Sequence, residues 1–169
     1  GIVIIARKHF LPILLIDEVM HYVQNNVNSP KWSTNLGWRK TIVEQGAQVS
    51  VLPLDNFKAV VKKEYVKLNN DYRDFDLGVS FYVWQRGSHI PWHNDGTHSI
   101  GSTIYLNKYW DSNNGGLFLW KDTKDNCIKV EIPEFNKMVL NDDHTPHAVS
   151  VIAPFSPDLR LTLQVWLDA

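Results

Sequence analysis

The residues with the clearest chemical potential are His93 and Asp95, separated by one asparagine, and His147, which follows 52 positions after Asp95. In an extended segment His93 and Asp95 point to the same face, because side chains of a strand alternate with a period of two. Two histidines and one carboxylate can bind one face of a metal ion and leave about three positions of the ion open. Taken alone, a His-x-Asp triplet is also typical of the polar face of a strand. The set predicts a metal site with these three residues as ligands.

Arg160 opens a second feature, an alternating run that ends at Leu167. In a strand Arg160, Thr162, Gln164 and Trp166 share one face, and the leucines share the other with Val165. A polar face with an arginine, backed by aliphatic residues, favours the inside of a barrel that holds a ligand. An exposed charge at the start of a strand is the alternative for Arg160 alone. A guanidinium binds a carboxylate through two parallel hydrogen bonds, so Arg160 is a candidate anchor for an acidic co-substrate.

Three further histidines compete with His147 as the third ligand. His89 has helical spacing to His93, but Pro91 between them argues against a helix. His144 lies in a polar, turn-like cluster and is interpreted as a loop residue or a neighbour of the ligands. His98 could lie near the site, but the expectation for such a histidine is a surface position. His147 therefore remains the preferred ligand.

Short strands that alternate with turns must position these residues. Beyond about residue 76, turn signals at residues 113–116 and 124–126 predict a hairpin and a second turn. Before that, Pro12 precedes one helical pattern and Asp55 is placed to cap another. The expected apolar faces are Leu14, Leu15, Val19, Tyr22, Val23 and Val27 in the first helix, and Phe57, Val60, Val61, Tyr65 and Leu68 in the second. The sequence predicts a mainly β fold with flanking helices (α+β), a double-stranded β-helix or jelly roll with the helices on its larger sheet.

Residues 29–51, between the two helices, allow two interpretations. Their tryptophans, Trp32 and Trp38, could belong to a loop over the pocket mouth that contacts substrate. They could instead cover the core as part of a structural β-ribbon, which is the interpretation we favour slightly.

Size and composition fit one domain over residues 1–169, with residues 1–75 as a helical support and 76–169 as the jelly-roll core. A net charge of −1 gives no general attraction to nucleic acid or to an anionic membrane. The one cysteine, Cys127, excludes an internal disulfide. No targeting segment is evident, so the expected location is cytoplasmic. The oligomeric state has no signature in the sequence.

From about residue 78 onward, the chain resembles the Fe(II)/2-oxoglutarate-dependent dioxygenases, in particular the prolyl 4-hydroxylase-like branch. The matching pieces occur in the order that this family shows over roughly ninety residues. They are Phe-Tyr-Val-Trp at 81–84, His-Asn-Asp at 93–95, Thr-Ile-Tyr-Leu-Asn at 103–107, Gly-Gly-Leu-Phe-Leu at 115–119, Pro-His-Ala-Val at 146–149, and finally Arg160 with Trp166.

The resemblance implies a role for each matching residue. His93, Asp95 and His147 would bind Fe(II), and Arg160 would hold the distal carboxylate of 2-oxoglutarate. Tyr105 would hydrogen-bond the same carboxylate. The other residues expected to line the co-substrate pocket are Tyr82, Gln164 and Trp166.

The activity implied is hydroxylation of an unactivated C–H bond by O2, with conversion of 2-oxoglutarate to succinate and CO2. Prolyl hydroxylation of a peptide or protein ranks first, although a small-molecule substrate fits the same scaffold. Ascorbate is the expected rescuing reductant.

Two other classes of protein remain as alternatives. A cupin-type metalloenzyme that does not use 2-oxoglutarate would not need an inward-facing Arg160. A non-catalytic jelly-roll binding module would use Trp32, Trp38 and Trp84 to stack on a ligand and would bind no Fe(II).

Overall fold

Two antiparallel β-sheets form the body of the protein. The computed structural model describes residues 4–34, 46–94, 100–142 and 144–169. The strands are β1 (Ile4–Arg7), β2 (Ser33–Thr34), β3 (Val49–Pro53), β4 (Asp76–Trp84), β5 (Ile90–His93), β6 (Ile100–Tyr105), β7 (Phe118–Asp122), β8 (Cys127–Glu131), β9 (Met138–Asn141), β10 (His147–Val149) and β11 (Arg160–Asp168). Across the described ranges, the larger sheet has the order β1-β9-β6-β11-β4-β3-β2 and the smaller sheet β5-β10-β7-β8.

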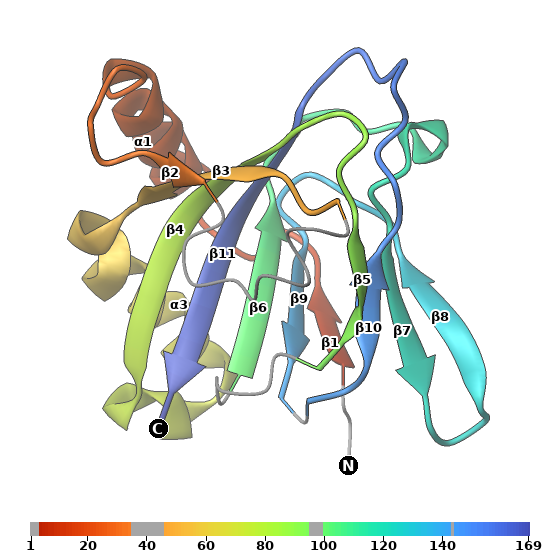
Figure 1. Cartoon of the computed structure of the whole chain (residues 1–169). Helices are drawn as coiled ribbons and strands as arrows, with labels where there is room; N and C mark the ends of the chain where they lie inside the picture. The colour runs from red at the N-terminus through yellow and green to blue at the C-terminus, as the bar shows by residue number, and fades with distance from the viewer. Residues whose placement is uncertain (1–3, 35–45, 95–99, 143) are drawn as a thin grey trace.

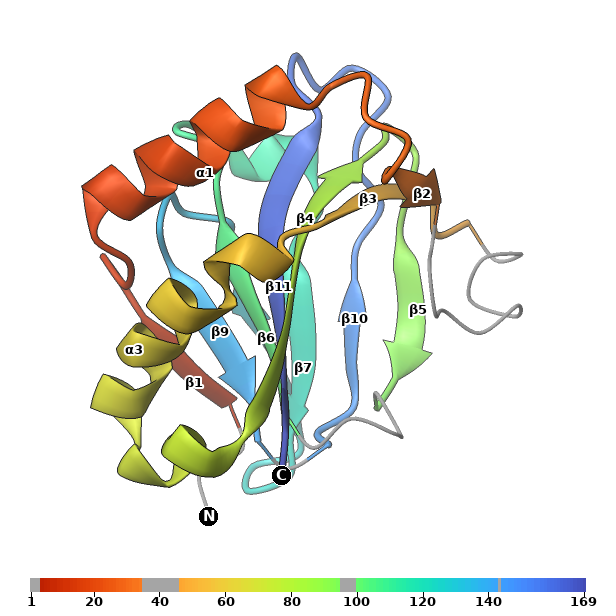
Figure 2. The same cartoon turned by 90° about the vertical axis from the view of Figure 1, so that its left-hand side faces the viewer.

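Among the described residues, two helices cover the outer face of the larger sheet, and the smaller sheet faces its other side (Figures 1 and 2). The helices are α1 (Ile13–Asn25) and α3 (Lys58–Leu68). This arrangement confirms the predicted jelly roll with helices on the larger sheet. The sequence predicts a helical support in residues 1–75. Their described part also provides three strands of the larger sheet, β1, β2 and β3.

The helix-facing core explains why α1 and α3 form. Leu15, Ile16, Val19 and Val23 of α1 are buried, in one cluster with Val61 and Tyr65 of α3. Each fully buried aliphatic side chain contributes about 1.5–3 kcal/mol.

Part of the predicted α1 face is wrong. Leu14 is 75% exposed and Val27 is 62% exposed, whereas Ile16, which the prediction omitted, is buried. The buried stripe is narrower than the apolar sequence, because the sheet covers only one side of the helix.

The predicted cap of the second helix by Asp55 is also not observed. A 3-10 turn, η1 (Asp55–Phe57), precedes α3, so Phe57 takes the cap position and no side-chain cap bond forms. Asp55 instead lies 3.6 Å from the ammonium nitrogen of Lys58, an exposed pair. Such exposed pairs contribute less than about 1 kcal/mol.

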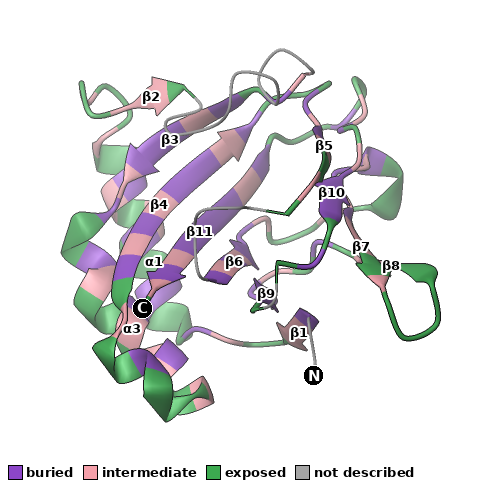
Figure 3. Cartoon of the chain, turned by 60° about the horizontal axis from the view of Figure 1, so that its bottom comes forward, coloured by how far each residue is buried: buried purple, intermediate pink, exposed green. Residues whose placement is uncertain are grey.

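Strand β11 divides the two environments of the larger sheet. It pairs with β4 along its whole length and with β6 on the other side. Leu163, Val165 and Leu167 enter the helix-facing core, and the predicted polar face with Arg160 lies on the opposite side. Figure 3 shows buried positions along the length of both β4 and β11.

One turn prediction is confirmed and one is wrong. Residues 124–126 connect β7 and β8, which pair as a hairpin. Residues 113–116 do not form a hairpin, because the chain crosses there from β6 in the larger sheet to β7 in the smaller. The 3-10 turn η3 (Ser112–Asn114) is followed by Gly115, whose φ of 71° and bridge to Ile152 need a residue without a side chain.

The segment of residues 29–51 is described only at its ends. Strands β2 and β3 pair with each other, as a β-ribbon requires. Trp32 packs edge-on against Phe81 at 6.3 Å between ring centroids and donates its indole hydrogen bond to Asn26 O at 2.8 Å. Trp38 lies outside the described residues.

None of the helices described is both long and apolar enough to cross a membrane.

Candidate active site

His93 and His147 meet across a strand pair of the smaller sheet. They are direct partners in the register of β5 and β10, and their ring centroids lie 4.2 Å apart at an interplanar angle of 54°. His147 is buried and His93 is half-buried. Two residues that lie 54 positions apart in the sequence are thus brought side by side by strand pairing.

The two imidazoles are oriented by the same local pattern. Nδ1 of His93 lies 2.8 Å from Pro91 O, and Nδ1 of His147 lies 2.8 Å from Thr145 O. A carbonyl only accepts, so these short contacts favour the tautomer with the hydrogen on Nδ1, in which Nε2 carries the lone pair. Metal-binding histidines commonly donate their other ring N–H to a backbone carbonyl in this way. The pair has the tautomer that a metal site requires.

Asn141 at the end of β9 fixes the carbonyl that orients His147. Its side-chain amide donates to Thr145 O at 2.9 Å, and its side-chain carbonyl accepts from Thr145 N at 3.1 Å. Thr145 O therefore accepts from both Asn141 and His147. The larger sheet holds the ring in the smaller sheet through this link.

The predicted carboxylate ligand, Asp95, lies outside the described residues, and so does His98. Within the described ranges no third His, Cys, Asp or Glu joins the two histidines as a metal-binding group. His144 is exposed, with Nδ1 3.3 Å from Asn94 O. His89 packs against Gly46, and its Nδ1 is buried without a partner in the described structure.

Arg160 is held at the start of β11 by three contacts. Its Nε donates to Gly116 O at 3.0 Å, its guanidinium carbon lies 4.6 Å from the Trp84 ring centroid, and it lies 5.3 Å from the Tyr105 ring centroid. Contacts with an aromatic face stabilise a desolvated cation by about 2 kcal/mol. Arg160 is only 1% exposed. The alternative of a surface charge is therefore wrong.

Two polar atoms around this arginine are buried without a hydrogen-bond partner in the described part of the chain. They are Nη1 of Arg160 and the phenol oxygen of Tyr105. An unsatisfied buried group costs about 1–3 kcal/mol, and more when the group is charged. A carboxylate accepts hydrogen bonds from both kinds of donor. The chemistry of this end of the site fits an acidic ligand such as the distal end of 2-oxoglutarate.

The phenol of Tyr105 remains a donor at neutral pH. Burial raises the pKa of Tyr105 to about 12, although the nearby Arg160 cation opposes the shift. Burial also lowers the pKa of Arg160, which Tyr105 counteracts, and the guanidinium keeps its charge at neutral pH. The site thus presents one cation and one neutral O–H.

This pKa predicts a loss of stability in alkali. The phenol of Tyr105 has an ordinary pKa of about 10 when the chain is unfolded. Because the folded value is about 12, stability is fully present below pH of about 10 and falls as the pH rises toward 12. The slope is about 1.4 kcal/mol per pH unit for each such group. Urea unfolding at several alkaline pH values measures this slope. Tyr105→Phe should give a shallower slope than wild type. Equal slopes would contradict the raised pKa of Tyr105.

Gly116 shapes the position of Arg160. A Cβ at Gly116 would lie 2.8 Å from Arg160 Cδ and 3.0 Å from its Nε, and the φ of Gly116 is +63°. We expect Gly116→Ala to displace the guanidinium and to weaken 2-oxoglutarate binding about tenfold, measured by calorimetry, since a displaced charged hydrogen bond costs about 1.5–3 kcal/mol.

Gly87→Ala is the matched control for this prediction. Gly87 has a φ of +81°, but a Cβ there would meet nothing within 4 Å. It reproduces the backbone strain without the contact, so its affinity for 2-oxoglutarate should stay at the wild-type value. Equal affinities of the two variants would show that Gly116 does not position Arg160.

The remaining predicted pocket residues lie on the inner face of the larger sheet. Tyr82 is buried, 6.0 Å from Trp84 between ring centroids. Gln164 accepts a hydrogen bond from Thr103 Oγ1 at 2.7 Å, and Trp166 pairs with Gly78 and Gly101 in the strand register. All of them belong to strands that flank or include β11.

Three residues of the site were not assigned to it from the sequence. Trp84, which the sequence offers as a stacking residue of a binding module, covers Arg160 and donates its indole N–H to Thr162 Oγ1 at 3.0 Å. Gly116 belongs to the predicted turn and to the segment at 115–119 that resembles the family, but neither pattern assigns it a role at the site. Asn141 has no sequence signal, because its role depends on the loop that follows β9.

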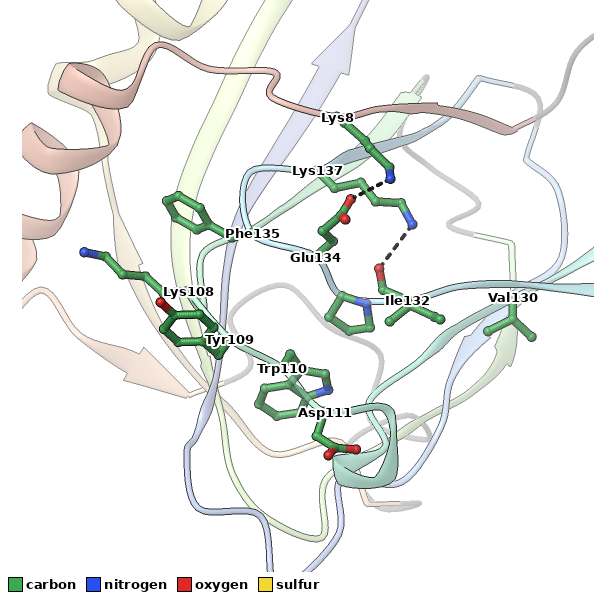
Figure 4. A pocket seen from close by; sticks show the side chains of 11 residues that line it. Lys8, Lys108, Tyr109, Trp110, Asp111, Val130, Ile132, Glu134, Phe135 and Lys137 are labelled. Carbon is green, nitrogen blue, oxygen red and sulfur yellow. Dashed lines mark hydrogen bonds and ion pairs between the residues drawn. The ribbon is translucent and has the colours of Figure 1, made fainter.

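A separate groove of about 580 Å³ lies away from these residues (Figure 4). Its lining includes Lys8, Lys108, Tyr109, Trp110 and Glu134, and none of the predicted site residues. Lys8 lies 3.5 Å from Glu134 in an exposed ion pair. The groove carries no group with the chemistry of the histidine pair.

Solved structures of similar fold include several prolyl hydroxylases. A prolyl-4-hydroxylase from Pseudomonas putida superposes with a TM-score of 0.75 at 18% identity, covering 98% of this chain and 92% of that one. A Trichoplax adhaerens prolyl hydroxylase, solved with a hypoxia inducible factor peptide fragment, gives 0.74 at 18% identity, with 98% and 83% covered. A viral collagen prolyl hydroxylase from Paramecium Bursaria Chlorella virus-1 gives 0.62 at 11% identity, with 99% and 96% covered.

These likenesses establish the double-stranded β-helix of prolyl hydroxylases as the fold of this chain. Comparison with curated protein sequences finds no match. The sequence profile of the 2OG-Fe(II) oxygenase superfamily matches residues 77–168, which is more than half of the chain. The match covers His93, His147 and Arg160. The chain therefore belongs to the 2OG-Fe(II) oxygenase superfamily and is a 2-oxoglutarate-dependent dioxygenase.

Proposed function

We propose that this dioxygenase hydroxylates a proline residue in a peptide or protein, with iron held by His93, Asp95 and His147. In this reaction O2 and 2-oxoglutarate are consumed, one oxygen atom enters the C–H bond of the substrate, and succinate and CO2 are released. The bound metal and co-substrate supply the oxidising chemistry. The protein contributes ligand geometry, co-substrate orientation and a dry cavity.

The observation that carries the proposal is the pair of buried donors at Arg160 and Tyr105. Nη1 of Arg160 and the phenol of Tyr105 have no partner in the described structure, and the distal carboxylate of 2-oxoglutarate supplies acceptors for both. Gly116 O accepts the hydrogen bond of Arg160 Nε, so that contact does not occupy Nη1, which remains for the ligand. Arg160 and Tyr105 thus orient the co-substrate from its far end.

The two histidines support the other half of the proposal. Their Nδ1 atoms are committed to Pro91 O and Thr145 O, so each ring offers Nε2 as the metal ligand. Asp95 follows His93 by two positions and would complete the set.

The proposal of peptidyl proline as the substrate rests on the solved structures that share this fold. Several of the similar structures are prolyl hydroxylases, and the Trichoplax enzyme was solved with a peptide fragment. A small-molecule substrate is the alternative. We propose ascorbate as the reductant that restores enzyme after turnover without substrate.

The first test is binding of the co-substrate. Fe(II)-loaded protein is titrated with 2-oxoglutarate under anaerobic conditions, and the metal-to-ligand charge-transfer band is followed by visible absorbance. A saturating band supports the assigned pair of metal and co-substrate. The absence of a band in iron-loaded protein would overturn it.

The second test addresses the substrate. Proline-containing peptides, and the same peptides with alanine in place of proline, are incubated with the loaded enzyme, O2 and ascorbate. We expect the gain of one oxygen atom by mass spectrometry, with matching succinate, only for the proline peptides. Succinate formation stimulated by free amino acids and by no peptide would favour a small-molecule substrate instead.

A further inference from the structure

One buried donor has no role in the function proposed above, namely the indole N–H of Trp120 on β7. Its Nε1 is buried and has no hydrogen-bond partner in the described structure. Three other indoles donate hydrogen bonds within the protein. Trp32 donates to Asn26 O at 2.8 Å, Trp84 donates to Thr162 Oγ1 at 3.0 Å, and Trp110 donates to Gly115 O at 2.8 Å. Trp120 therefore differs from these tryptophans in needing an acceptor from outside the described chain.

Strand register places Trp120 beside the histidine pair. His147 pairs with His93 on one side and with Trp120 on the other, and Trp120 pairs in turn with Lys129. The four residues form one row across the smaller sheet. Paired residues in a sheet project to the same face, so Trp120 shares the face of both histidines.

That face is the one between the two sheets. Phe118, two positions before Trp120 on the same strand face, is buried and stacks on His147 at 5.2 Å between ring centroids. Trp120 itself packs against a buried cluster of Ile4, Tyr105, Phe118 and Val139. The indole thus lies between the site's histidine end and its Tyr105 end.

We propose that Trp120 donates a hydrogen bond to a carboxylate oxygen at the oxo-acid end of the bound co-substrate. This inference rests on the proposed function, because it concerns the same ligand. Arg160 and Tyr105 provide donors for the distal carboxylate, whereas Trp120 stands in the row of the proposed metal ligands. Its indole is thus placed for the carboxylate at the metal end.

A neutral donor also suits this position. A second cation beside the metal would be repelled by the ion in a medium of low dielectric constant, whereas an indole N–H binds the carboxylate without adding charge. Lys129, the next residue in the row, is held by Asp125 Oδ2 at 2.7 Å. Its charge is directed to the β7–β8 turn.

Trp120→Phe separates this role from a structural one. The variant keeps an aromatic ring and removes a donor that has no partner in the described structure, so the unliganded protein should melt at the same temperature or higher. Its dissociation constant for 2-oxoglutarate, measured by calorimetry on the Zn(II)-loaded protein, should rise about tenfold, as expected for one lost hydrogen bond to a charged group.

Trp110→Phe is the matched control. Its indole N–H is already bonded to Gly115 O, and Trp110 lies in the separate groove of Figure 4. This control should lose thermal stability and keep its affinity for 2-oxoglutarate, the reverse of the effect expected at Trp120. Equal affinity of wild type and Trp120→Phe would overturn the inference.

A direct observation of the N–H keeps the inference testable if Trp120→Phe does not fold. In wild-type protein labelled with nitrogen-15 and loaded with Zn(II), each indole N–H gives its own resonance. On addition of 2-oxoglutarate, the Trp120 resonance should move downfield, whereas those of Trp32 and Trp110 should stay in place. Levulinate has the keto group and the distal carboxylate but no carboxylate at the oxo-acid end, so it should not produce the shift.

The outcomes separate the two proposals. If 2-oxoglutarate binds and the Trp120 resonance does not move, or levulinate moves it equally, the role of Trp120 is overturned and the proposed function stands. If wild-type protein loaded with metal binds no 2-oxoglutarate at all, the proposed function is overturned, and the inference about Trp120 falls with it.

Discussion

Arg160→Met should abolish tight binding of 2-oxoglutarate while the protein stays folded. Arg160 is 1% exposed, and its Nη1 has no partner in the described part of the protein. In the proposed complex, removing it deletes two charge-assisted hydrogen bonds to the distal carboxylate, each worth about 1.5–3 kcal/mol. The dissociation constant should therefore rise by a factor of about 10² to 10³, since each 1.4 kcal/mol is a factor of ten.

The thermal stability of Arg160→Met should not fall together with its affinity for 2-oxoglutarate. Replacing a buried charge with an apolar side chain of similar length is often neutral or stabilising, because the desolvation of the charge is avoided. Methionine is flexible and fills the space beside Trp84 and Tyr105. The melting temperature of unliganded Arg160→Met should thus equal or exceed that of wild type, and the stabilisation by added 2-oxoglutarate should disappear.

The controls for Arg160→Met address charge and metal. Arg73→Met removes an arginine that is exposed on the helix side and bonded to Asn70 Oδ1, and it should leave the affinity unchanged. Metal binding should persist in Arg160→Met, since the histidines are untouched. If Arg160→Met retained activity and 2-oxoglutarate affinity, a metalloenzyme that does not use this co-substrate would explain the site better.

Local pattern was sufficient to predict the elements around Arg160. The alternation from Arg160 to Leu167 predicts a strand with one polar face, and β11 has that strand and that face. The pattern succeeds because β11 is central and separates two different environments. One face of the strand therefore carries aliphatic side chains and the other carries polar ones. Where a surface is half-covered, as at Leu14 of α1 and at Val27 just after its end, apolar sequence and burial diverge.

Contacts between distant segments could not be predicted from local pattern. Gly116 fixes Arg160 from 44 positions away, and Trp84 covers it from the end of a different strand. Asn141 orients His147 only through the carbonyl of Thr145. The turn at residues 113–116 illustrates the same limit, because its glycines predict a tight turn but not which sheet the next strand joins.

His147→Ala should remove metal binding, and with it all turnover. His147 is buried, and Thr145 O holds its Nδ1 so that Nε2 carries the lone pair. A site of two histidines and one carboxylate loses a third of its protein ligands in this variant. Losses of residues that merely orient a ligand cost about 10- to 100-fold in metal affinity, so loss of the ligand itself should exceed that range. Calorimetry with Co(II) or Zn(II) measures this without reference to activity.

His144→Ala distinguishes this assignment from its nearest competitor. His144 lies three positions earlier, is exposed, and contacts the backbone of Asn94 through Nδ1. Its removal should change metal affinity by less than tenfold, whereas His147→Ala and His93→Ala should each lose binding. Because His93 and His147 are paired across β5 and β10 at 4.2 Å between ring centroids, either loss leaves one imidazole that cannot chelate alone. Retained metal binding in His147→Ala, with loss in His144→Ala, would move the third ligand to His144 and require a different arrangement of the loop between β9 and β10.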